Sequence, residues 1–149
     1  MTDQEKLAKK AMSGYPVCYI ERCPKKEQCL HWKTGEQMPD RVAFCLSSIN
    51  PRYQNVATEQ CPQFRSAEKM KMAKGMTRIF TDDMPKRVEK YVRQQLIANH
   101  HRTYFYEYRN GSRLIPPDMQ QEIIRLFRQA GWHGEVSFDS YVDDYDWSY

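Results

Sequence analysis

The sequence contains no long apolar run. No stretch approaches the roughly 18 apolar residues that suggest a membrane-spanning helix. The opening residues, MTDQEKLAKKAM, are charged and lack the apolar segment of a secretory signal. We therefore predict a cytoplasmic protein without membrane contact. That compartment is reducing and the cysteines number five, so a disulfide framework is not expected.

Common catalytic motifs are also missing. The chain has no Gly-rich phosphate loop, no serine nucleophile elbow and no His-Glu-x-x-His motif. The acidic pairs Asp82-Asp83 and Asp143-Asp144 lie in capping or tail contexts, and nothing marks either pair as a catalytic couple. We expect a protein that is not an enzyme.

Lysine and arginine are absent after Arg128. Residues 1–128 hold all 23 basic residues against 14 acidic ones, whereas the last 21 residues hold five acids among aromatic side chains. The acidic tail either docks on the basic body, or the body binds a polyanion while the tail contacts a protein. A solvated charged surface without a partner is the third interpretation.

Cysteine is absent after Cys61, so all five cysteines lie within 44 residues. Two of them precede proline, at Cys23-Pro24 and Cys61-Pro62, a feature also found near iron–sulfur ligands. Residues 15–64 show little apolar periodicity. Such a loop-rich segment is predicted to need a source of order beyond an apolar core.

Thiolates are preferred ligands of zinc and of iron–sulfur clusters. Four cysteines are the candidate metal ligands: Cys18, Cys23, Cys29 and Cys61. His31 could replace one thiolate, and Cys45, within the apolar stretch VAFCL, is predicted to be a buried thiol. The gaps of four and five residues exceed the Cys-x2-Cys of a zinc knuckle. A single zinc ion would require the sulfurs to lie within about 4 Å of one another.

Two alternatives remain for the cysteines. They are core thiols without a metal, or they are redox-active thiols whose pKa is lowered by Lys25 and Lys26. The absence of Cys-x-x-Cys disfavours the redox alternative.

Periodicity and turn signals predict an α+β fold: a loop-rich cysteine module followed by helix, β-hairpin and helix with a short third strand. The stretch VAFCLSSINP is predicted to be a buried strand or a short helix. The two modules would be residues 1–64 and 65–149, unless the chain forms one compact domain. The other predicted elements are an N-terminal helix or frayed tail over 1–14, helices over 65–79, 81–101 and 116–130, a hairpin over 103–115 around Asn110-Gly111, a strand over 135–138, and a tail with helical spacing from Phe138.

Basic residues concentrate in the middle of the chain, where residues 65–113 hold 12 Lys or Arg against five acids. Such a surface could neutralise phosphates, while the aromatic side chains at 104, 105, 106 and 108 stack on exposed bases. The alternative is a solvated helix face beside core aromatics. The candidate nucleic-acid contacts are Lys86, Arg87, Lys90, Arg93, Arg109 and Arg113.

Several stretches resemble a family of uncharacterised bacterial proteins, a domain of unknown function with an N-terminal Cys-x4-Cys-Pro-x4-Cys segment. They are YPVCYIERCPKKEQCLHW, CLSSINP, CPQF, YEYRNGSRLIPPDMQQEI and FDSYVDDYDW. The resemblance implies a small cytoplasmic protein whose cysteines are a family feature, and it supplies no activity. It also implies an anaerobic host, in which an oxygen-sensitive cluster is tolerable, and a tail that docks within the domain.

Taken together, these features favour a non-enzymatic, metal-stapled binding or regulatory module that holds zinc or an iron–sulfur cluster and contacts nucleic acid. The alternative is a metal-free adaptor that binds a protein partner through the acidic, aromatic C-terminus.

Overall fold

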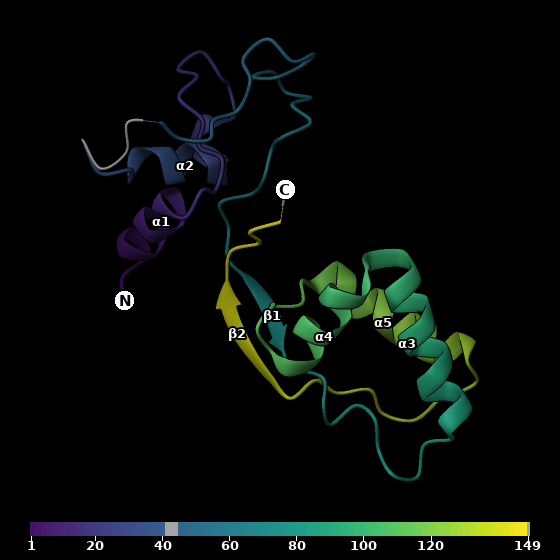
Figure 1. Ribbon diagram of the computed structural model, residues 1–149. Coiled ribbons are helices and arrows are strands. Elements are labelled where there is room, and N and C mark those ends of the chain that lie inside the picture. The colour runs from purple at the N-terminus through teal and green to yellow at the C-terminus, as the bar shows by residue number, and fades with distance from the viewer. Residues whose placement is uncertain (41–44, 149) are drawn as a thin grey trace. The chain divides into compact units, whose positions relative to one another are not determined.

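The computed structural model describes residues 1–40 and 45–148, in which helices accompany a two-stranded antiparallel sheet (Figure 1). The predicted α+β class is confirmed. No helix in these ranges is long and apolar enough to cross a membrane. In chain order the elements are α1 (Asp3–Met12), the 3₁₀ turn η1 (Lys26–Gln28), α2 (Leu30–Glu36), β1 (Met70–Lys74), α3 (Lys86–His100), α4 (Arg102–Asn110), α5 (Pro117–Gln129) and β2 (Ser140–Asp144).

The chain divides into two compact units. Unit 1 comprises Met1–Glu68 together with the C-terminal residues from Tyr145 onward, and unit 2 comprises Lys69–Asp144. The chain therefore passes from one unit to the other twice, directly before β1 and directly after β2.

Unit 1 has a small apolar core built around α1 and α2. A capping box begins α1, because the Thr2 hydroxyl accepts from the Glu5 N–H and the Glu5 carboxylate accepts from the Thr2 N–H. The predicted N-terminal helix is therefore present. The buried core consists of Leu7, Tyr15, Leu30 and Tyr145, with Trp147 packed against it. The aromatic tail thus docks within the chain.

Unit 2 has the larger core, formed by the sheet and three helices. The buried stripe of α3 is Val88, Val92 and Leu96, at helical spacing. Pro117 begins α5, whose buried residues are Ile123, Leu126 and Phe127. Both of these helices were predicted and are confirmed. Their side chains pack in one cluster that also includes Ala73 from β1.

The predicted hairpin over 103–115 is wrong, since residues Arg102–Asn110 form α4. Phe105 and Tyr108, three positions apart, are the buried residues of this helix, so its aromatics follow a helical period. Asn110-Gly111 ends the helix. Gly111 takes the left-handed conformation (φ +83°) that is common at helix C-termini and is also favoured in hairpin turns.

Three further local predictions are wrong. The predicted helix over 65–79 contains β1, the tail with helical spacing contains β2, and residues 135–138 are not a strand. β1 pairs antiparallel with β2, from Met70 opposite Asp144 to Lys74 opposite Ser140. The partners are far apart in sequence, so local periodicity carries no sign of the pairing. The strand or helix predicted over 42–51 lies partly outside the described residues, and those from Cys45 to Pro51 form neither element.

Asp139 fixes the turn after β1 to the segment before β2. Its carboxylate accepts from the Thr77 N–H (3.1 Å), the Thr77 hydroxyl (2.6 Å) and the Arg78 N–H (2.8 Å). Its own N–H donates to the Gly75 carbonyl (3.0 Å). Gly75 has φ +82°, and a Cβ there would lie 2.6 Å from the Asp139 Oδ2, so only glycine fits. Partial burial raises the pKa of Asp139, but the hydrogen bonds from Thr77 and Arg78 outweigh it, and the pKa lies below its usual value.

Replacing Asp139 with Asn should lower the free energy of unfolding by about 1–2 kcal/mol at neutral pH, because an amide group would face N–H donors. The folded-state pKa is depressed, so the stabilisation is complete above the ordinary value of 3.8 and is lost as the pH falls through the folded-state pKa. Urea denaturation across pH should therefore show the two proteins converging in acid. Asp82→Asn, at an exposed position, is the control; a pH-independent difference would contradict the explanation.

Candidate functional site

The four cysteines predicted as ligands line one pocket in unit 1: Cys18, Cys23, Cys29 and Cys61. Its volume is about 20 Å³. The rest of the wall is largely apolar and includes Trp32, Ile49, Val56 and Phe64. The fold thus gathers four soft donor atoms from separate loops along the wall of one partly open pocket.

Cys18 and Cys29 are held at the start of α2. The Cys18 N–H donates to the His31 carbonyl (3.1 Å), which fastens the N-terminal segment to the helix. Cys29 directly precedes α2, its N–H donates to the Lys26 carbonyl (3.1 Å), and it forms an antiparallel bridge with Ser66. Backbone pairing therefore sets both positions without help from the side chains.

The two Cys-Pro pairs occupy equivalent turns. In each, the cysteine N–H donates to the carbonyl three residues before, and the cysteine carbonyl accepts from the N–H three residues after. The bonds are Cys23 to Ile20 (3.2 Å), Lys26 to Cys23 (3.4 Å), Cys61 to Thr58 (3.1 Å) and Phe64 to Cys61 (3.2 Å). The proline that follows each cysteine has no N–H to satisfy, so it fits between the two turns.

The thiols of the pocket are close enough to influence one another. Burial raises the pKa of Cys18; a hydrogen bond from the Ile20 N–H opposes this, and the thiols of Cys29, Cys23 and Cys61 raise it further. This direction is opposite to that of a reactive, low-pKa cysteine. All five cysteines of the chain are free thiols.

His31 lines the same pocket and is fully buried. Its Nδ1 lies 2.6 Å from the Pro16 carbonyl, which assigns the proton to Nδ1, and its ring stacks on Tyr15 at 4.8 Å. Burial lowers its pKa; the Pro16 and Gln63 carbonyls oppose this and the charge of Arg65 adds to it. His31 is thus a neutral imidazole. Its Nε2 is buried and has no hydrogen-bond partner within the described part of the chain.

The side chains that line the pocket are not arranged around one metal position. Within residues 1–40 and 45–148, no three His, Cys, Asp or Glu side chains are arranged so as to hold one metal ion. The four cysteines share a pocket, but the close tetrahedral packing that a single zinc ion requires is not formed.

Cys45 is exposed, so the prediction that it is a buried thiol is wrong. Its neighbour Leu46 is exposed as well. An apolar stretch in the sequence therefore does not by itself show that its residues are buried. The lysines near the thiols contact aromatic rings at the pocket: the Lys25 Nζ lies 3.7 Å from the Phe64 ring centre, and the Lys26 Nζ lies 4.8 Å from that of Trp32. The spacing of residues in the sequence does not indicate that the Phe64 and Trp32 rings lie beside these lysines.

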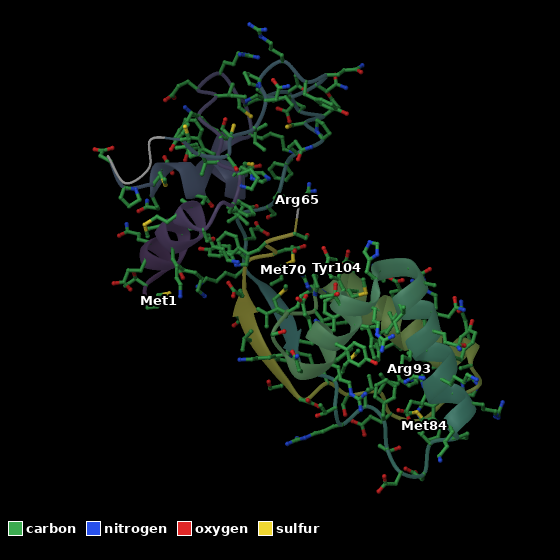
Figure 2. The ribbon with its side chains drawn as sticks, viewed as in Figure 1. Met1, Arg65, Met70, Met84, Arg93 and Tyr104 are labelled. Atoms are coloured by element: carbon green, nitrogen blue, oxygen red, sulfur yellow. The ribbon has the colours of Figure 1, made fainter. Side chains whose placement is uncertain are left out.

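The basic residues predicted to bind nucleic acid separate into two groups. Lys86, Arg87, Lys90 and Arg93 are exposed on α3, where Arg93 is labelled in Figure 2. Arg109 and Arg113 instead have partners inside unit 2. The Arg109 guanidinium lies 5.7 Å from the Phe80 ring centre, and Arg113 pairs with Glu107 at 2.6 Å and lies 3.9 Å from the Tyr104 ring centre.

The aromatic side chains of α4 also divide. Phe105 and Tyr108 are buried in the core and are not available to stack on bases, whereas Tyr104 and Tyr106 are exposed. The stacking platform predicted from four aromatics is thus reduced to two.

Comparison with known proteins gives one match. The sequence model of a family described as "Family of unknown function (DUF6078)" matches residues 1–147. The chain belongs to this family. The predicted resemblance to a domain of unknown function is confirmed at that level. No curated protein and no solved structure matches the chain. The family supplies no activity, so the function is argued from the pocket and the surface.

Replacing Gly35 of α2 with Ala should destabilise the protein by up to about 2 kcal/mol. An added Cβ would lie 3.0 Å from the Cys18 carbonyl oxygen and 3.4 Å from the Val17 Cβ. Overpacking costs about 1–3 kcal/mol, which outweighs the gain of about 1 kcal/mol from better helix propensity. Urea denaturation tests this; Glu36→Ala, at the adjacent exposed position, should change stability by less than about 0.5 kcal/mol. A Gly35→Ala protein as stable as the wild type would show that α2 does not pack tightly here.

Proposed function

We propose that this protein is a non-enzymatic cytoplasmic binding module whose first unit is stapled by a metal centre. Zinc or an iron–sulfur cluster would be held by Cys18, Cys23, Cys29 and Cys61. The observation that carries the proposal is that these four cysteines, from separate loops, line one pocket while the fifth is exposed outside it.

A metal explains this arrangement better than apolar packing of thiols does. The main buried cluster of unit 1 has four residues, whereas that of unit 2 has fourteen. Residues 45–68 form no helix and no extended strand. A unit with so little core gains from a cross-link among its loops, and metal binding would supply folding free energy directly.

Serine in place of Cys61 should remove most of the bound metal and destabilise unit 1, because one of four thiolate ligands is lost. Serine in place of Cys45 is the matched control and should leave the metal content unchanged, since that thiol is exposed and lies outside the pocket. Elemental analysis of protein purified without oxygen makes the comparison. Metal loss in both variants, or in neither, would contradict the proposed ligand set.

Nucleic acid is the partner that the surface of α3 favours. Lys86, Lys90 and Arg93 lie on one stripe of the helix, with Arg87 beside it and the buried stripe opposite. Within the described residues no carboxylate lies within ion-pair distance of these four side chains. These four cations form no ion pair within the described residues, although Glu89 lies among them on the helix, and they can approach successive phosphates.

Replacing Lys86, Lys90 and Arg93 together with Gln should weaken nucleic-acid binding about 100-fold near physiological salt. It should also reduce the slope of log affinity against log salt by about 3 for duplex DNA, because three phosphate contacts are lost. The control replaces three exposed cations of unit 1, Lys9, Arg22 and Arg52, and should leave the slope unchanged. Gel-shift titrations at several salt concentrations measure both quantities. Equal losses in the two triple variants would indicate non-specific charge attraction.

A further inference from the structure

Four cysteines and His31 line one pocket of unit 1. A single zinc ion lies about 2.3 Å from each thiolate that binds it, so its four sulfurs must lie within about 4 Å of one another.

The side chains of the pocket do not have this arrangement. In the part of the chain that the structure describes, no three potential ligands are placed to hold a single ion, although four thiols and His31 line the pocket. Backbone hydrogen bonds hold the turns and the bridge on which the cysteines lie.

A polynuclear occupant removes this mismatch. In an iron–sulfur cluster the thiolates bind different iron atoms, and bridging sulfides fill the middle, so the four cysteine sulfurs stay apart. We propose that the pocket binds a polynuclear iron–sulfur cluster through Cys18, Cys23, Cys29 and Cys61. This inference rests on the proposed metal centre and names its class.

The rest of the pocket suits such a cluster. A cluster with four thiolate ligands is anionic, and Lys25 and Lys26 bring two ammonium groups to the wall. Trp32 and Phe64, which these ammonium groups contact, limit the access of water. Ligation exchanges four S–H protons for four Fe–S bonds, while iron and sulfide are supplied from solution. Four cysteines saturate the cluster, so no iron is left open to a substrate, which agrees with a binding rather than a catalytic role.

The full-length protein, purified without oxygen, provides the test. Zinc, iron and acid-labile sulfide are measured on the same sample, together with the visible absorption and the iron–iron scattering in X-ray absorption. We expect iron and sulfide in equal amounts, at least about two of each per chain, with little zinc.

The outcomes separate the inference from the proposed function. One zinc or one iron per chain without sulfide would overturn the cluster and leave the metal-stapled module standing. Protein without any metal, before and after incubation with iron and sulfide, would overturn both. Cys45→Ser should retain the iron and sulfide of the wild type and Cys61→Ser should lose most of them; retention of the cluster in Cys61→Ser would overturn the assigned ligands.

Discussion

The convergence of four thiols on one pocket is the constraint on which unit 1 depends. Within the residues that the structure describes, this unit has the helices α1 and α2, the 3₁₀ turn η1 and a small buried cluster, so apolar burial supplies only part of its order. Its loops are instead positioned by backbone hydrogen bonds, and most of these bonds involve a cysteine or its close neighbours. The Cys-Pro turns, the bridge at Cys29 and the contact between Cys18 and α2 all direct side chains into the same space. An occupant that binds those side chains would lock each loop to the others.

The second constraint is the pairing of β1 with β2, which brings the C-terminal segment back to the beginning of unit 2. Asp139 and Gly75 fix the turn beside this pair, and the register then places Asp144 opposite Met70. The chain next enters the core of unit 1 at Tyr145. The acidic, aromatic tail thus has two intramolecular roles, first as a strand and then as a core element. The aromatic residues of the tail therefore have a structural role within the chain itself.

The two proposals place different functions on different units. The metal centre would belong to unit 1, where the thiols and the buried imidazole of His31 lie. The phosphate contacts would belong to unit 2, where α3 exposes the cations Lys86, Arg87, Lys90 and Arg93. If both hold, occupancy of the pocket governs the folding of unit 1, while α3 needs only the apolar core beneath Val88 and Val92.

The sequence by itself determined the elements whose signals are local. The capping box at Thr2, the apolar stripe of α3 and the proline at the start of α5 act within one or two helical turns, so these helices were predictable. Spacing and proline neighbours also distinguish four cysteines from the fifth. The apolar residues around Cys45 predict a buried thiol, whereas Cys45 is exposed.

Only the tertiary structure decided the rest. Asn110-Gly111 suits a hairpin turn and a helix end equally, and the packing of Phe105 and Tyr108 selects the helix. β1 and β2 take strand conformation because each satisfies the other's backbone groups, and no local pattern reports a partner so distant in sequence. The pocket likewise depends on long-range bonds, such as those from Leu30 to Arg65 and from Ala67 to Gln28, which bring Cys61 toward the other three thiols. Spacing indicates which cysteines are candidate ligands, but their gathering around one pocket exists only once the loops are folded together.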